Sequence, residues 1–261
     1  MREDLAGNGG IGLTDRPRVL LVTGGGRGIG AAIVRGALRQ GYRVCFSYQQ
    51  DHGAAARLSE EMVAQGGEVS AVQGDVADPD FARAFFDAAE AASGPVHALV
   101  NNAGITGRIG AFSDLSLDAM RRTIDTNLLG TMLMAQEAVR RWEAAGIAGR
   151  MVNISSIAST LGAPGEYVHY AATKAAIEAL TIGLGKEVAA KGIRINAVAP
   201  GTAYTDIHAA AGAPDRPARV VSRVPLARIA EPDEIAAAVL WLLSDEASYV
   251  TATVLRVSGG L

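Results

Sequence analysis

The chain has 261 residues, of which 49% are hydrophobic and 20% are charged, and its formal net charge is -3. Such a balance provides no basic surface for nucleic acid or for an anionic membrane, so it favours a small-molecule partner. No apolar run is long enough to span a bilayer.

We expect a single domain over residues 17–261, because no linker rich in proline, serine or charge divides them. Residues 1–16 are polar and glycine-rich, without the apolar stretch of a signal peptide, and are predicted to form a flexible tail. These features together predict a cytoplasmic protein. The single cysteine, Cys45, lies in an apolar run and is predicted to be a buried, inert thiol. It can form no internal disulfide or cysteine-based zinc cage, and we expect no metal site.

Strand-like and helical segments alternate along the chain. In the first half, strands are expected at 18–23, 43–48, 68–73 and 98–101, and helices at 30–40, 54–65 and 79–91. In the second half, helices are expected at about 117–143, 168–190 and 232–243, and strands at 151–154, 193–198 and 253–257. This alternation, with strongly apolar strands, predicts a doubly wound (Rossmann) α/β fold: a mostly parallel seven-stranded sheet with helices on both faces.

A glycine-rich segment joins the first expected strand to the first expected helix. Its glycines at 24, 28 and 30 are spaced differently from the commoner G-x-G-x-x-G pattern. Glycine lets the backbone approach phosphates, and a helix N-terminus offers free N-H groups and the positive end of its dipole. The segment therefore predicts a pyrophosphate site that includes Gly24, Gly26, Arg27, Gly28, Ile29 and Gly30.

Other candidate ligand-binding residues follow the third and fourth expected strands. In open α/β sheets, ligands bind at the carboxyl ends of the strands. Taken alone, these residue types also suit ordinary turns. The candidates are Asp75, Val76, Asn102, Ala103 and Gly104.

Tyr170 and Lys174 form a pair suited to proton transfer. Residues four apart share one face of a helix, so Lys174 should lie beside the Tyr170 ring. The pKa of a free tyrosine is about 10, and a nearby cation lowers it by favouring the phenolate. The pair could therefore donate a proton during carbonyl reduction, although the same spacing also occurs on ordinary surface helices.

The order of these motifs resembles that of short-chain dehydrogenases/reductases over residues 17–261, nearly the whole chain. Similarity is greatest to the glucose-1-dehydrogenase-like and 3-oxoacyl-carrier-protein-reductase-like members. The matching motifs are the glycine pattern, Asn102-Ala103-Gly104, Asn127, Ser156, Tyr170 with Lys174, and Pro200-Gly201.

The resemblance implies a role for each of four residues. Tyr170 would be the general acid in reduction and the base in oxidation. Lys174 would hold the nicotinamide ribose and lower the Tyr170 pKa, and Asn127 would position a water that links Lys174 to solvent. Ser156 would hydrogen-bond the substrate oxygen. Because alternate strand residues face opposite sides, we expect Ser156, and not Ser155, to point into the site.

The resemblance also implies the surroundings of the substrate. The separation of Ser156 and Tyr170 is one residue longer than is commonest in the family, and the loop at 162–165 could absorb it. Residues 204–224, rich in alanine, are predicted to form a substrate lid, and His208 within them is expected at the surface. Pro200, Gly201, Thr202 and Thr205 would contact the nicotinamide end of the cofactor. Mostly apolar residues are expected at the mouth: Ile157, Ala158, Pro164, Tyr167, Tyr204 and Ile207.

Cofactor choice depends on the end of the second strand. NAD-preferring dinucleotide folds carry an acidic residue there, whereas in this chain Asp51 comes two or three residues late. Together with Arg27 in the glycine loop, this favours NADP(H). NAD(H) remains possible, because many NADP-using relatives have a basic residue where this chain has Gln49. The candidate contacts are Ser47, Tyr48 and Gln49.

The sequence thus predicts an NADP-preferring oxidoreductase acting on a small alcohol or ketone, sugar-like or keto in character. A 3-oxoacyl-carrier-protein reductase is one alternative. Its acidic partner would require a basic patch, for which Arg140, Arg141 and Lys191 are scattered candidates.

An alternative of another class is a catalytically silent NADP(H)-binding regulator, whose signature would be a broken set of catalytic residues. A dehydratase or epimerase would need a larger substrate domain. Residues 245–261 resemble the family's subunit-contact segment and, with the long apolar helices, suggest a homotetramer or a dimer.

Overall fold

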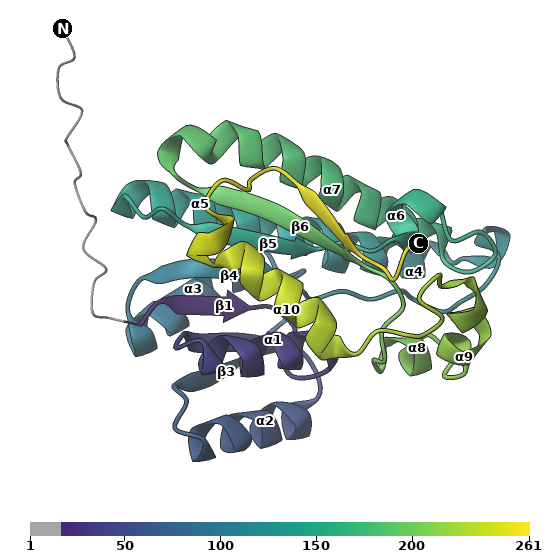
Figure 1. The fold of residues 1–261 in the computed structure, drawn as a ribbon, viewed down its shortest axis with the longest axis horizontal. Coiled ribbons are helices and arrows are strands. Elements are labelled where there is room, and N and C mark those ends of the chain that lie inside the picture. The colour runs from purple at the N-terminus through teal and green to yellow at the C-terminus, as the bar shows by residue number, and fades with distance from the viewer. Residues whose placement is uncertain (1–16) are drawn as a thin grey trace, which may run out of the picture.

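The computed structural model describes residues 17–261, and the tail predicted at residues 1–16 lies outside them. Seven strands form one sheet in the order β3-β2-β1-β4-β5-β6-β7, and all neighbouring strands are parallel. The predicted doubly wound sheet is therefore confirmed (Figure 1). The strands are β1 (Val19–Val22), β2 (Arg43–Tyr48), β3 (Val69–Gln73), β4 (Val96–Asn101), β5 (Arg150–Ile154), β6 (Arg194–Pro200) and β7 (Val254–Val257).

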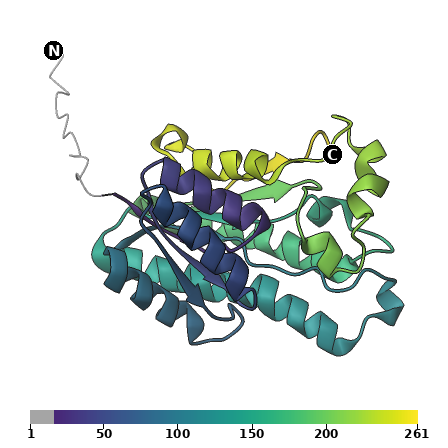
Figure 2. The same cartoon turned by 90° about the horizontal axis from the view of Figure 1, so that it is seen from below.

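Helices cover both faces of this sheet (Figure 1; Figure 2). One face packs on α1 (Gly28–Arg39), α2 (His52–Ala64) and α10 (Pro232–Leu243), and the other on α3 (Phe81–Ser93), α5 (Gly130–Ala145) and α7 (Val168–Val188). Leu20 and Val22 of β1 enter the first core, whereas Val19 and Leu21 enter the second. Since side chains alternate along a strand and both faces are buried, the strands read as continuous apolar runs.

The long helix predicted at 117–143 is interrupted. α4 (Leu117–Ile124) passes into a π-helical turn, Asp125–Leu129, before α5 begins. The carbonyl oxygen of Asn127 in this turn accepts a hydrogen bond from the Thr131 hydroxyl at 2.7 Å. Single π-turns of this kind occur often at functional sites, and hydrophobic periodicity does not reveal them.

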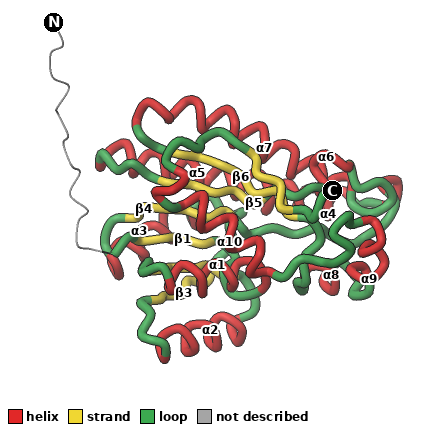
Figure 3. The backbone as a smooth tube through the Cα atoms, in the orientation of Figure 1, coloured by secondary structure: helices red, strands yellow, loops and turns green. Residues whose placement is uncertain are grey.

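Several short helices lie near the carboxyl ends of the strands. α6 (Ala158–Leu161) follows β5, and the segment 204–224 contains α8 (Ile207–Ala210) and α9 (Arg216–Val220). Figure 3 shows long loop segments at the same end of the sheet. Further short 3₁₀ turns are Phe112–Asp114, Ala189–Lys191, Val221–Arg223 and Asp245–Ala247.

Two other predictions concern burial and hydrophobicity. Cys45 on β2 is buried, as expected, and this burial raises the pKa of its thiol. Over residues 17–261, no helix has both the length and the apolar composition needed to cross a bilayer.

Candidate active site

A cavity of about 1670 Å³ lies at the carboxyl ends of the strands. It exceeds the roughly 300–1,000 Å³ of a typical small-ligand pocket, so it has room for a dinucleotide and a substrate together. All of the predicted cofactor-binding residues line it, as do three of the four predicted catalytic residues. These residues are Gly24, Gly26, Arg27, Gly28, Ile29, Gly30, Ser47, Tyr48, Gln49, Asp75, Val76, Asn102, Ala103, Gly104, Ser156, Tyr170, Lys174, Pro200, Gly201, Thr202 and Thr205.

Close packing requires glycine in the loop between β1 and α1. A Cβ on Gly30 would lie 2.2 Å from the Gly24 carbonyl oxygen, and a Cβ on Gly25 would lie 2.5 Å from the Cβ of Phe46. Gly28, the first residue of α1, has a φ of 53°, in the left-handed region. No side chain caps the first turn of this helix and no acidic residue lies in it. Its N-terminus can therefore accept a phosphate group, which fits a dinucleotide cofactor.

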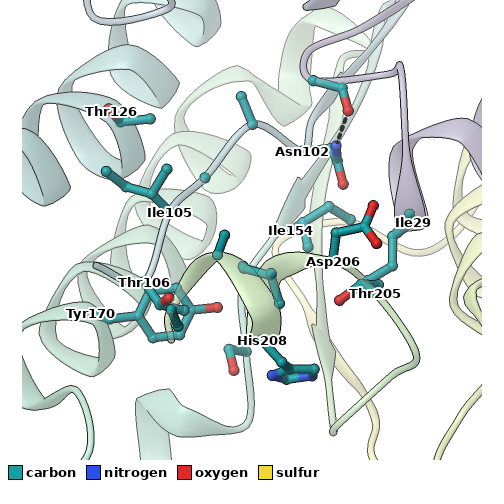
Figure 4. A pocket seen from close by; sticks show the side chains of 18 of the residues that line it. Ile29, Asn102, Ile105, Thr106, Thr126, Ile154, Tyr170, Thr205, Asp206 and His208 are labelled. Carbon is teal, nitrogen blue, oxygen red and sulfur yellow. Dashed lines mark hydrogen bonds between the residues drawn. The ribbon is translucent and has the colours of Figure 1, made fainter. Parts of the chain in front are cut away.

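Asn102 braces this loop from the end of β4. Its side-chain Nδ2 donates to the carbonyl oxygens of Thr23 at 3.0 Å and Gly24 at 2.9 Å. Its backbone N-H and that of Ala103 both donate to the Thr23 hydroxyl, each at 3.0 Å. Asn102 thus lines the cavity and also fixes the shape of the glycine loop (Figure 4).

The polar side chains after β2 have defined partners. Asp51 caps α2, since its Oδ1 accepts from the Ala54 backbone N-H at 2.9 Å. Gln49 donates from Nε2 to Oδ2 of Asp75 at 2.6 Å. Arg27 is exposed at the cavity and forms no ion pair with any residue from 17 to 261. Its guanidinium is consequently available to an anionic ligand.

Tyr170 and Lys174 lie one turn apart near the start of α7. Lys174 Nζ is 5.5 Å from the centroid of the Tyr170 ring, and both residues are buried. Burial lowers the pKa of Lys174 from its ordinary 10.5 to about 8. Figure 4 shows the Tyr170 ring entering the cavity, with Thr205 and Asp206 on the segment after β6.

The pKa of Tyr170 corrects one sequence expectation. Burial raises this pKa above its ordinary value of 10, while a hydrogen bond with Ser156 and the charge of Arg216 act to lower it. The prediction assigned that lowering effect to Lys174. In the structure, Lys174 is itself desolvated and directs its Nζ to the Ile154 carbonyl oxygen at 2.7 Å.

Both adjacent serines line the cavity, but their side chains have different surroundings. Ser156 lines the cavity, and its Oγ accepts from the Ala158 backbone N-H at 3.1 Å. Ser155 is only 2% exposed and donates to Oε1 of Glu178 on α7 at 2.7 Å. One serine is therefore available to a ligand, and the other ties β5 to α7.

The loop between Ser156 and Tyr170 contains three residues in the left-handed region. Gly162 and Gly165 both have a φ of 73°, and Ala163 between them has a φ of 47°. The loop proposed to absorb the longer spacing therefore has a sharply turned backbone, while Ser156 and Tyr170 both line the cavity.

Asn127, the fourth predicted catalytic residue, is fully buried and does not line the cavity. Its Oδ1 accepts from the Ile105 backbone N-H at 2.8 Å, and its Nδ2 donates to the Ile105 carbonyl oxygen at 2.8 Å and to Thr173 Oγ1 at 3.1 Å. A Cβ on Gly104 would lie 3.3 Å from Asn127 Oδ1 and 3.5 Å from Lys174 Nζ. Asn127 thus lies behind Gly104 with its side chain bonded to protein groups, and its role toward a water stays a prediction.

The substrate side of the cavity contains an ion pair that the sequence analysis missed. Arg216 of α9 donates from Nη2 to Oε2 of Glu166 at 2.8 Å, and both residues line the cavity. The Arg216 guanidinium carbon lies 5.2 Å from the centroid of the Tyr167 ring. That ring meets the Tyr170 ring edge-on, with their centroids 5.2 Å apart. No local pattern joins these residues, because 50 positions separate Glu166 from Arg216.

The predicted mouth residues are mostly placed as expected. Ile157, Ala158, Pro164, Tyr167 and Ile207 line the cavity. Tyr204 does not, since its side chain points to solvent and is 53% exposed. His208, expected at the surface, is half-buried and lines the cavity, with its Nε2 3.1 Å from the Ala203 carbonyl oxygen (Figure 4). The short helix α8 turns His208 inward.

Comparisons with known proteins cover nearly the whole described chain. A family model described as enoyl-(acyl carrier protein) reductase matches residues 24–261. The chain is 44% identical to the uncharacterized oxidoreductase YgfF of Escherichia coli K12, over 93% of this chain and 99% of that protein. It is 40% identical to an L-rhamnose 1-dehydrogenase (NAD(P)(+)) of Azotobacter vinelandii, over 94% of this chain and 96% of that protein.

A solved structure extends the likeness to three dimensions. A variant of actinorhodin polyketide ketoreductase, crystallised with NADPH, superposes with a TM-score of 0.87. The two chains are 32% identical, and the match covers 94% of this chain and 97% of the other.

Proposed function

We propose a specific activity for this chain, which belongs to the short-chain dehydrogenase/reductase family: reversible hydride transfer between NADP(H) and a small, hydroxyl-rich alcohol or ketone. Membership in that family makes the chain an NAD(P)-dependent oxidoreductase that acts on alcohols and carbonyls. The preference for NADP(H), the residue roles and the substrate class are the proposal. The observation that carries it is the convergence of Ser156, Tyr170 and Lys174 on the wall of one cavity, with Lys174 Nζ 5.5 Å from the centroid of the Tyr170 ring.

Tyr170 and Ser156 act together on the substrate oxygen. The cofactor, when bound, supplies the hydride in reduction. Tyr170 gives its hydroxyl proton to the carbonyl oxygen, and Ser156 donates a hydrogen bond to the same oxygen as negative charge develops there. In oxidation, the Tyr170 phenolate accepts the alcohol proton. Burial raises the pKa of Tyr170, so its hydroxyl is protonated at neutral pH and the proton needed for reduction is present.

Lys174 would bind the nicotinamide ribose through its ammonium group. It has one backbone acceptor, the Ile154 carbonyl oxygen, so further hydrogens of that group are available to ribose hydroxyls. A lysine whose pKa is about 8 can also lose a proton near neutral pH. It is therefore suited to restore the Tyr170 proton between turnovers.

The preference for NADP(H) is supported by the residues around the adenosine end. Arg27 is exposed on the glycine loop, and Asp51 uses Oδ1 to cap α2. A guanidinium binds a ribose 2'-phosphate well, whereas a dedicated carboxylate would favour the 2'-hydroxyl of NAD(H). The related ketoreductase was crystallised with NADPH.

A hydroxyl-rich substrate is supported by the polar wall facing Tyr170. Glu166 and Arg216 lie there as a charged pair, and Glu166 retains acceptor capacity for substrate hydroxyls. A steroid-sized apolar ligand would offer no donor to the remaining acceptor sites of Glu166 and would shield them from water, which is unfavourable. The relative from Azotobacter is named for the oxidation of a sugar, L-rhamnose.

One observation favours a second candidate, a 3-oxoacyl-carrier-protein reductase. Besides Arg27, three exposed arginines line the cavity: Arg108, Arg122 and Arg223. An acidic carrier protein would be attracted to such charges. Two of the basic residues that the sequence analysis named for this patch are already paired. Arg141 binds three carboxylates, and Lys191 pairs with Glu143.

Assembly and location form a further part of the proposal. Tyr249, near the C-terminus, is fully exposed, and Trp241 of α10 is 40% exposed. Large apolar side chains at a surface favour association, so we propose a homotetramer or a dimer. We also propose a cytoplasmic location, where NADP(H) is available. Light scattering of the purified protein measures the mass of the assembly.

The test is a two-part assay with purified protein. NADPH and NADH are titrated by fluorescence, and turnover is then followed by absorbance. The panel contains L-rhamnose and D-glucose with NADP⁺, and simple ketones, quinones and acetoacetyl thioesters with NADPH. We expect tighter binding of NADPH and the fastest turnover with a sugar. Turnover of thioesters alone would favour the carrier-protein alternative, and binding without any turnover would favour the silent regulator.

A further inference from the structure

Arg216 connects the segment 204–224 to two other walls of the cavity. Its Nη2 donates to Oε2 of Glu166 at 2.8 Å and its Nε to the same oxygen at 3.1 Å. Its Nη1 reaches Oγ1 of Thr202, just after β6, at 3.4 Å. Its guanidinium also lies over the Tyr167 ring. The Arg216 side chain thus connects α9 to the loop before α7 and to the residues just after β6.

The ion pair of Arg216 with Glu166 is more buried than the neighbouring ion pair of Arg219 with Asp215. The side chains of Arg216 and Glu166 are 11% and 26% exposed, and several N-H groups of one guanidinium meet one carboxylate. Arg219 and Asp215, on and beside the same helix, form a looser pair at 3.2 Å with 53% and 68% exposure. Exposed ion pairs contribute little, whereas a partly buried, multiply bonded arginine fixes geometry. Arg216 is therefore the residue of α9 that is suited to hold it in place.

The pair also reaches the proposed proton donor. The Tyr167 ring contacts both groups: its centroid lies 5.2 Å from the Arg216 guanidinium carbon and 5.2 Å from the Tyr170 ring centroid. The positive charge of Arg216 lowers the pKa of Tyr170. The other titratable or charged groups on this part of the cavity wall include Lys174 of α7, Glu166 and Tyr167 of the loop before it, Asp206 and His208 of the segment 204–224, and Arg108 and Arg223.

We propose that Arg216 is a positioning residue: it holds the segment 204–224 against Glu166 and Tyr167, and in that closed arrangement places a positive charge beside Tyr170. The inference rests on the proposed function, because it requires Tyr170 to transfer the proton. When the segment moves away, the cation leaves with it. Closure over the substrate and the readiness of Tyr170 to act as a base are therefore coupled.

The test measures kcat against pH in the oxidation of L-rhamnose by NADP⁺, or of the panel alcohol with the highest rate. The rate should rise with pH as Tyr170 loses its proton. In Arg216→Gln this rise should move to higher pH, and on its acidic side kcat should fall about tenfold for every pH unit that the rise moves. Arg216→Lys keeps the charge and loses the fork, so KM should increase while the rise stays near its original pH.

Two further variants separate this role from a merely structural one. Glu166→Gln removes the carboxylate charge but keeps an amide oxygen that can accept from Arg216, so the segment stays in place and the rise should stay where it is or move to lower pH. Arg219→Gln removes the same charge from an exposed site three residues away and should leave the profile in place. A rise at the same pH in Arg216→Gln, or at higher pH in both Arg216→Gln and Glu166→Gln, would overturn the inference. If Arg216→Gln does not fold, Arg216→Lys and Glu166→Gln still decide, because neither variant removes the Arg216 position's positive charge and neither must move the rise upward.

Tyr170→Phe is measured alongside. If it retains turnover, the proposed function itself is wrong. If it is inactive while the pH profile of Arg216→Gln matches that of the parent protein, only the role of Arg216 fails.

Discussion

Lys174 Nζ donates a hydrogen bond to the carbonyl oxygen of Ile154 at 2.7 Å, so the first turns of α7 are tied to the end of β5. The lysine is 3% exposed, and burial lowers its pKa to about 8. A desolvated ammonium group destabilises the folded protein as long as it stays charged. The same residue that is proposed to bind the cofactor therefore lowers the stability of the cofactor-free protein.

This leads to a prediction for stability against pH. Below about pH 8, Lys174 is charged in both the folded and unfolded states. Between about pH 8 and its ordinary pKa of 10.5, the unfolded state binds more protons, so the free energy of unfolding rises with pH. The slope from one proton is at most about 1.4 kcal/mol per pH unit. Urea unfolding at pH 7.5 and 9.5 should show this gain relative to Lys174→Met, whereas an identical pH dependence of the two proteins would contradict it.

Alanine substitutions at Gly30, beside the glycine loop, and at Gly183, in α7, should have opposite outcomes. In Gly30→Ala, the new Cβ would lie 2.2 Å from the Gly24 carbonyl oxygen and 2.7 Å from Asn102 Nδ2, so the loop must shift. We expect a loss of about 1–3 kcal/mol in stability and weaker NADPH binding. Gly183→Ala in α7 is the control, because its Cβ would meet no atom within 4 Å. It should leave NADPH binding unchanged and stabilise the helix. Equal NADPH affinities in the two variants would argue against the loop as the pyrophosphate site.

Arg27 should control the choice of cofactor. Removing its charge in Arg27→Gln takes away a partner for the 2'-phosphate, and a hydrogen bond to a charged group is worth about 1.5–3 kcal/mol. The Kd for NADPH should rise roughly tenfold or more, whereas that for NADH should change little. Fluorescence titration with both cofactors measures this difference. Equal effects on NADPH and NADH would show that Arg27 does not contact the 2'-phosphate.

The adjacent serines should respond differently to the same substitution. Ser156→Ala removes a donor to the substrate oxygen, and kcat should fall roughly 100-fold with cofactor affinity unchanged. Ser155→Ala removes one hydrogen-bond donor to Glu178, which keeps the Ser159 hydroxyl at 2.5 Å. The substitution should lower stability by about 1 kcal/mol. Turnover rates and urea unfolding of both variants distinguish the roles. A larger loss of kcat in Ser155→Ala would reverse the assignment of the two serines.

The sequence was sufficient to predict the sheet and the residues that line the cavity beside the glycine loop, because both depend on local chemistry. The apolar strands β1, β2 and β4 and the glycines at 24, 28 and 30 each satisfy a constraint that acts within a few residues. Parallel topology then brings Asn102 and Pro200 to one edge of the sheet, since strand ends meet there.

The substrate side of the site could not be predicted from the sequence in the same way. The contact between Glu166 and Arg216 depends on how the segment 204–224 folds back, and its two short helices are too brief to give a periodic signal. The π-helical turn at Asn127 was missed for a similar reason, since α4 and α5 together read as one continuous amphipathic helix.

The most direct test of the account is Tyr170→Phe, assayed for NADPH affinity and for turnover with Tyr204→Phe as its control. The control removes the same hydroxyl group from Tyr204, a residue that does not line the cavity. We predict that Tyr170→Phe binds NADPH with a Kd within about threefold of the parent protein, while its turnover falls roughly 100-fold or more, because only the transferable proton is removed. Tyr204→Phe should retain turnover. Substantial turnover by Tyr170→Phe across the pH range would contradict the assignment of Tyr170 as the proton donor.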